Sequence, residues 1–136
     1  MRTKNFIASL DEYQLGGIAT LFFSLAEHTA DNLTSIGQLG DYNRYLSVAN
    51  YFDKKLDALH RADTRRRLKV QIGYAPALLI TQTNVPDDWL DVYGRTVYTA
   101  LQRDILHFLE AELHRLRYRD QTKRQLLAAP NQTKRL

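Results

Sequence analysis

Hydrophobic residues recur at helical spacing near the start of the chain. A spacing of three to four residues marks one face of an α-helix, and it is kept by Leu10, Tyr13, Gly17, Leu21 and Leu25. Ser9 and Glu12 stand three residues apart, as the partners of a capping box do, so Ser9 is the predicted N-cap. We expect this first helix to continue to about Ile36.

Two adjacent glycines, Gly16 and Gly17, interrupt the pattern of this first helix. Each glycine costs about 1 kcal/mol of helix stability relative to alanine. The pair indicates either a kink or close packing against a second helix. The small size of glycine favours close packing.

A second long helix is predicted after a turn that glycines bound. Gly37 and Gly40 bracket the end of the first helix, and Asp41 is a suitable N-cap for the next one. The apolar face of this second helix presents Tyr42, Tyr45, Ala49, Phe52, Leu56 and Leu59. We expect the helix to continue through the basic residues 65–67 and to stop near Gly73.

Residues 74–84 contain a short apolar run whose structure periodicity alone does not decide. Pro76 suits the first turn of a helix. One isolated strand at this place would have no partner elsewhere in the sequence. We therefore predict a short helix or a buried loop.

The last predicted helix, residues 87 to about 127, starts acidic and ends basic. Asp87, Asp88 and Asp91 lie in its first turns, and this charge order suits the helix dipole. Its expected core stripe consists of Val97, Leu101, Ile105, Phe108 or Leu109, Leu113 and Leu116. Little apolar surface follows Tyr118, and an isolated helix of this length is marginal. We expect this overhang to pair with a second copy, as a homodimer, or to become ordered on another partner.

These elements predict an all-α fold: a small bundle of three long helices plus one short helix or buried loop, with an overhanging basic C-terminal helix. Residues 1–129 form one helical domain, and residues 130–136 a frayed basic tail. The predicted core anchors are Phe6, Phe22, Phe23, Phe52, Trp89 and Phe108.

The composition excludes several kinds of chemical site and of membrane segment. It contains no cysteine, which excludes disulfides, thiolate metal sites and cysteine nucleophiles. No apolar run approaches the length of a membrane span, and no signal-peptide core follows Met1. We expect a cytoplasmic protein with no membrane association.

The net charge of +4 is unevenly distributed, since the charged residues of each sign cluster along the chain. One basic block consists of Lys54, Lys55, Arg61, Arg65, Arg66, Arg67 and Lys69, and a second of Arg115, Arg117, Arg119, Lys123 and Arg124, continued by Lys134 and Arg135. The two blocks merge into one patch if the second and last helices run parallel, and lie at opposite ends if they run antiparallel. Solvated helix faces, a nucleic-acid surface and a site for an acidic protein all fit this pattern.

No residue pattern points firmly to catalysis or to a cofactor. His107, Glu110 and His114 share one helical face, but a metal site there needs ligands from other helices. No phosphate-binding loop or nucleophile elbow is present, and no pair of short helices joined by a tight turn suggests a helix-turn-helix. We expect no metal, no cofactor and no enzymatic activity.

The sequence therefore predicts a small non-enzymatic helical accessory protein. Our leading hypothesis is that it binds DNA or RNA, without sequence specificity, through backbone contacts from both basic blocks. The alternative is an adaptor or regulator that docks an acidic or helical protein partner. A merged basic patch would favour the first hypothesis, and an exposed apolar groove beside the last helix would favour the second.

Overall fold

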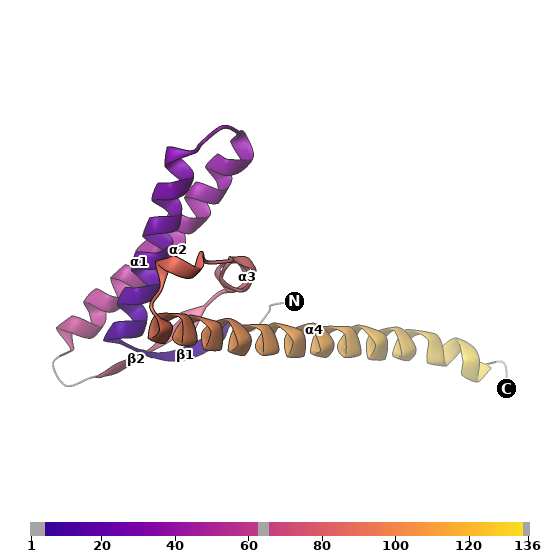
Figure 1. Ribbon diagram of the computed structural model, residues 1–136. Coiled ribbons are helices and arrows are strands. Elements are labelled where there is room, and N and C mark those ends of the chain that lie inside the picture. The colour runs from indigo at the N-terminus through magenta and orange to yellow at the C-terminus, as the bar shows by residue number, and fades with distance from the viewer. Residues whose placement is uncertain (1–4, 63–65, 135–136) are drawn as a thin grey trace.

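The computed structural model describes residues 5–62 and 66–134 (Figure 1), and their side chains except those of residues 87, 92, 93 and 128–134. In chain order the elements are β1 (Phe6–Asp11), α1 (Glu12–Asp31), α2 (Ile36–Arg61), β2 (Arg67–Ile72), α3 (Tyr74–Gln82), the 3-10 helix η1 (Asp87–Trp89) and α4 (Val92–Lys134). Three long helices and one short helix are thus present in the described residues, as predicted.

The fold also contains a two-stranded antiparallel sheet, so the prediction of a purely helical protein is wrong in this respect. Strand β1 pairs with β2, and the apolar partners across the sheet are Phe6 and Ile72, Ala8 and Val70, and Leu10 and Leu68. Strand β2 alternates apolar and polar residues, and β1 does so except at the exposed Ile7, which is the pattern of a sheet with one buried face. The buried face joins the hydrophobic core through Ala8, Leu10, Val70 and Ile72.

The N-cap of the first helix lies two residues after the predicted one. Ser9 lies within β1, and the N-cap of α1 is Asp11. The Asp11 carboxylate accepts a hydrogen bond from the backbone N–H of Gln14 (2.8 Å), and the Gln14 side chain accepts one from the backbone N–H of Asp11 (3.0 Å). This is a capping box with Asp11 and Gln14 in place of Ser9 and Glu12.

The turn between the first two helices also lies earlier than predicted. Helix α1 ends at Asp31, and α2 begins at Ile36 with Ser35 as its N-cap. The Ser35 hydroxyl accepts a hydrogen bond from the backbone N–H of Gln38 (3.2 Å). Gly37 and Gly40 therefore lie inside α2, and Asp41 is not a cap.

Helix α2 ends at Arg61, so its predicted continuation to Gly73 is wrong. Residues 67–72 form β2 instead, because their apolar side chains can all reach the core from one face of a strand. The following segment is the short helix α3, one of the two structures predicted for it. Tyr98 and Gln102 of α4 hold its C-terminal end by donating hydrogen bonds to the carbonyl oxygen of Ile80 (3.1 and 2.9 Å).

Helix α4 starts later and ends later than predicted. Asp87 and Asp88 belong to η1, and Asp91 precedes α4 and accepts a hydrogen bond from the backbone N–H of Gly94 (2.6 Å). The helix continues through residue 134. The fraying predicted from residue 130 stays a prediction, and residues 135–136 lie outside the described part of the chain.

The core gathers around Phe22 and Phe52, which are fully buried as predicted. Phe6, Phe23 and Trp89 are partly buried and pack against the core. Phe108 lies at the edge of the core, where its ring contacts the ring of Phe6 (5.5 Å between centroids).

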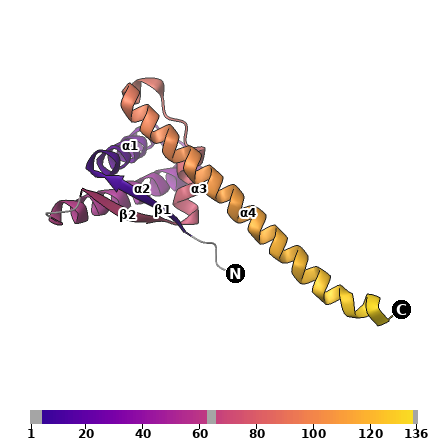
Figure 2. The ribbon, with the colours of Figure 1, turned by 90° about the horizontal axis from the view of Figure 1, so that it is seen from below.

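Helices α1 and α2 pack side by side as a hairpin, with the sheet near one end of it. Helix α4 crosses this body and then extends far beyond it, as both views show (Figures 1 and 2). We refer to residues 115–134 of α4 as the arm.

Candidate functional site

The first basic block surrounds the C-terminal end of α2 and the start of β2. Lys54 and Arg61 are exposed on α2, and Lys55 lies over the ring of Tyr51 (5.3 Å to the centroid). Arg66, Arg67 and Lys69 are also exposed. Arg67 donates hydrogen bonds to the side chain and backbone of Ser9 (3.1 and 2.7 Å), so it ties the two strands together. Arg65 lies outside the described residues.

The second basic block lies on the arm. Arg117, Arg119 and Lys123 are exposed, and the Arg124 guanidinium pairs with Asp120 (3.2 Å). Arg115 is different, because both oxygens of Glu112 accept hydrogen bonds from it (2.9 Å each). These hydrogen bonds raise the pKa of Arg115 above its ordinary value. Its charge is largely committed to Glu112.

The two basic blocks lie at opposite ends of the molecule. The C-terminal end of α2 points to one side of the body, and the arm leaves the body on the other side (Figures 1 and 2). One chain therefore does not merge the two blocks into a single patch. Whether either block binds nucleic acid stays a prediction.

A row of leucines on α4 lies partly exposed beside the body. Leu106, Leu109, Leu113 and Leu116, which we call the leucine stripe, follow the three- and four-residue spacing of a helix-pairing seam. Leu106 and Leu113 are 48% and 49% exposed, and Leu109 and Leu116 are half-buried. Leu113 was predicted to be a core residue, but it is not one, because the body ends before the apolar spacing does.

A different face of α4 packs against the body. Tyr98, Leu101, Ile105 and Glu112 are buried there. The leucine stripe lies beside this buried face, so the body covers it only in part. The apolar surface of α4 is thus wider than its contact with the body.

An apolar cleft of about 630 Å³ also lies between β1, α1 and the first half of α4. Its walls include Leu10, Ile18, Leu21, Val97 and Leu101, and Arg67, Asp91 and Asp104 are among its polar lining residues. Four of these apolar wall residues, Leu10, Ile18, Leu21 and Leu101, are themselves buried, so the cleft exposes little apolar surface.

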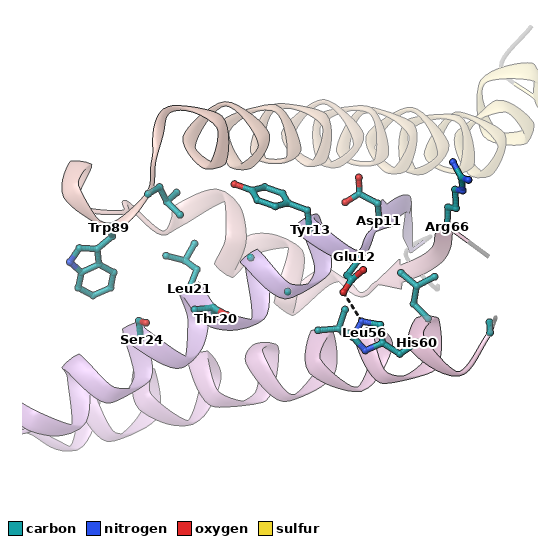
Figure 3. Close-up of a pocket in the computed structure, with 15 residues that line it drawn as sticks. Asp11, Glu12, Tyr13, Thr20, Leu21, Ser24, Leu56, His60, Arg66 and Trp89 are labelled. Atoms are coloured by element: carbon teal, nitrogen blue, oxygen red, sulfur yellow. Dashed lines mark hydrogen bonds and ion pairs between the residues drawn. The ribbon is translucent and has the colours of Figure 1, made fainter. Parts of the chain in front are cut away.

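A second and wider groove of about 1250 Å³ runs along α1 (Figure 3). Gly16, Gly17, Thr20 and Ser24 are among the α1 residues that line it, and Trp89 stands near one end. At the other end His60 Nε2 lies 2.9 Å from Glu12 Oε1, with both side chains well exposed. Such exposure gives this pair little of the desolvation that activates catalytic groups.

The glycine pair at this groove behaves differently from the prediction. A Cβ atom on Gly16 would lie 3.6 Å from Leu56 of α2, an ordinary contact distance, and one on Gly17 would meet nothing within 4 Å. Gly16 therefore faces α2 as expected, but close packing does not require either glycine. Helix α1 runs unbroken through both.

The remaining candidate chemistry does not assemble in the described residues. Within residues 5–62 and 66–134, no three histidine, aspartate or glutamate side chains are placed to hold a metal ion, and this includes His107, Glu110 and His114. The ring of His28 instead contacts Trp89 (5.7 Å between centroids).

Among the described residues, none of the helices combines the length and the apolar character needed to cross a membrane. No family model, curated protein or solved structure matches this chain. The geometry of α4 and the charge distribution are therefore the observations that bear on function.

Proposed function

We propose that this chain is a non-enzymatic interaction protein, which uses α4 to dock a helical partner along the leucine stripe. The observation that carries the proposal is that Leu106 and Leu113 are about half exposed. They lie on a helix that extends beyond the rest of the fold. Docking of a helical protein partner is the alternative hypothesis that the sequence offered.

The energetics favour a partner for this surface. Fully burying a leucine side chain contributes roughly 1.5–3 kcal/mol, so two half-exposed and two half-buried leucines offer a few kcal/mol to a binding helix. Residues at three- and four-residue spacing form the anchors of helix-in-groove and helix-pair recognition. The arm gains as well, because a helix without tertiary contacts is marginal in water.

Site-specific photocrosslinking in the native host tests this proposal. A benzophenone amino acid placed at Leu113 should form a covalent product with one defined polypeptide. The same group at Gln125, exposed on the opposite side of α4, should not. With the purified partner, Leu113→Glu should weaken binding at least about tenfold, and Gln125→Glu should not. Equal products from both positions, or none from either, would contradict the proposal.

Binding of a nucleic acid by the arm alone is a second candidate function. It is favoured by Tyr118, which is 68% exposed between the exposed arginines Arg117 and Arg119. Exposed aromatic rings among cations can stack on unpaired bases while the cations neutralise phosphates. This candidate needs only the second basic block and not both.

Two variants of equal net charge test this second candidate. One replaces Arg117, Arg119 and Lys123 by glutamine, and the other replaces Lys54, Lys55 and Arg61 by glutamine. If the arm binds, the first variant should lose affinity for single-stranded RNA and DNA and show a shallower salt dependence, because fewer counterions are released. Equal losses in both variants would indicate attraction by net charge alone. No binding at low salt would eliminate the candidate.

A further inference from the structure

The leucine stripe has the spacing of a helix-pairing seam over two heptads. Numbered as a heptad repeat, Leu106 and Leu113 occupy a positions, and Leu109 and Leu116 occupy d positions. Asp120 and Lys123 take the next a and d positions, so the fully apolar part of the seam ends at Leu116. The residues that a partner helix places opposite these leucines decide how much of the seam is buried.

The charges beside the stripe distinguish between possible partner directions. Glu110 flanks the first part of the seam at an e position, whereas Arg117, Arg119 and Lys123 lie on the arm. Two parallel copies of α4 would bring the basic arms together. Two antiparallel copies would bring each basic arm beside the acidic part of the other copy.

We propose that the helical partner of α4 is a second copy of this chain, paired antiparallel along the leucine stripe. The inference rests on the proposed function, and it adds the identity of the partner. In this pair, the arm of one copy lies along the first part of α4 of the other copy, the part that packs against that other copy's body. The arrangement is isologous, as a closed two-fold dimer requires.

Charge complementarity selects one alignment of the two helices. When Leu113 faces Leu116 of the second copy, the two-fold axis repeats the contact, and Glu110 stands opposite Arg117 of the second copy on the flank of the seam. At the ends of this alignment Asp120 and Lys123 stand opposite Leu109 and Leu106 of the second copy. On the flank Arg103 faces Arg124, whose charge is paired with Asp120 (3.2 Å). The Glu110–Arg117 contact occurs twice, once for each copy.

Another antiparallel alignment places Leu109 against Leu113 and Leu106 against Leu116. It buries more leucine surface, but it sets Glu110 against Glu110 of the second copy and Arg103 against Arg117. Like charges directly opposite each other on a helix pair are unfavourable. The two alignments therefore predict opposite effects of the same substitution at position 117.

Sedimentation velocity over a range of concentrations tests the proposal with the full-length chain. We expect reversible dimers that weaken at least about tenfold in Arg117→Glu, because two attractive contacts become repulsive. The double variant Glu110→Arg/Arg117→Glu reverses both charges and should restore dimerisation. Leu113→Glu should yield monomers, whereas Gln125→Glu should dimerise like the unmodified chain.

The outcomes separate the inference from the proposed function. A chain that stays monomeric at every concentration overturns self-pairing, while photocrosslinking at Leu113 still decides whether a different helix docks there. Stronger dimers in Arg117→Glu would overturn the proposed alignment. Far-ultraviolet circular dichroism of Leu113→Glu provides the folding control, and we expect an intact body because Leu113 is half exposed.

Discussion

Asp11 connects the end of β1 to the start of α1, and its carboxylate is the residue-scale feature that sets where the first helix begins. Removing an N-cap side chain costs about 1 kcal/mol. We therefore expect Asp11→Ala to lower the free energy of unfolding by this amount in urea titrations. Asp11→Asn, which keeps a side-chain oxygen to accept the hydrogen bond from the Gln14 backbone, should cost less. Equal losses of unfolding free energy in the two variants would show that the capping hydrogen bond of Asp11 does not stabilise the helix.

Tyr98 links stability to alkaline pH. Burial raises its pKa well above the ordinary tyrosine value, with a smaller contribution from Tyr45, while the hydrogen bond with Gln102 opposes the shift. Because the folded pKa exceeds the unfolded value of about 10, the neutral hydroxyl stabilises the fold below that pH. This contribution is lost as the pH rises through the folded pKa.

The test is urea unfolding at neutral pH and again above about pH 10, the unfolded tyrosine pKa. The unmodified chain should lose stability over this interval, and Tyr98→Phe should lose less of it. At neutral pH the variant should be less stable by about 1 kcal/mol, the usual net value of one hydrogen bond. The same pair of unfolding measurements on Tyr51→Phe shows how much of the alkaline loss of stability comes from Tyr51, whose pKa burial also raises. A pH dependence unchanged in Tyr98→Phe would contradict this assignment.

Substitution by alanine should change the thermal stability in opposite directions at Gly17 and at Gly94. A Cβ on Gly17 meets open space, so Gly17→Ala should stabilise α1 by up to about 1 kcal/mol. A Cβ on Gly94 would lie 2.9 Å from Asp91 Oδ1, the atom that accepts the hydrogen bond from the Gly94 backbone. Gly94→Ala should therefore lower the thermal midpoint, and Gly17→Ala should raise it. Two shifts of the same sign would be inconsistent with this geometry.

At the scale of elements, the arm should be dispensable for folding of the body. Residues 117–121 and 123–127 are exposed. A chain that ends at Leu116 should therefore unfold with a free energy within about 1 kcal/mol of the monomeric full-length chain. The helical circular dichroism signal per molecule should fall. A body that fails to fold without the arm would refute this expectation.

The sequence predicted the helices better than the sheet, for a physical reason. Helical spacing is local, so the apolar faces of α1, α2 and α4 could be located from it, whereas α3 was predicted only as a short helix or a buried loop. Leu68, Val70 and Ile72 also alternate as a strand does, but the second helix was expected to continue through them to near Gly73. Their partner strand β1 lies about sixty residues earlier, and spacing within one segment does not reveal such pairing.

The candidate site was only partly predictable for a related reason. Periodicity placed Leu113 and Leu116 on the apolar side of α4, but it does not tell how far the body reaches along the helix. The two basic blocks are visible in the sequence. Their separation in space depends on how the chain runs from α2 through β2 and α3 to α4. The exposure of the leucine stripe is a property of the assembled fold.

At the scale of the whole molecule, the extended arm leads to a prediction about shape. Helix α4 has 43 residues, which at a rise of about 1.5 Å per residue is roughly 65 Å of helix. A compact chain of 136 residues has a radius of gyration of about 14 Å. Because the arm projects away from the body (Figure 2), the monomer should exceed this radius clearly.

Small-angle X-ray scattering of the Leu113→Glu variant measures the radius without the contribution of self-pairing. The chain that ends at Leu116 serves as the control and should approach the radius of a compact chain of its own length. If the Leu113→Glu variant also scattered with a radius near 14 Å, the arm would be folded back on the body. The leucine stripe would then be covered within one chain, and neither a helical partner nor a second copy could reach it.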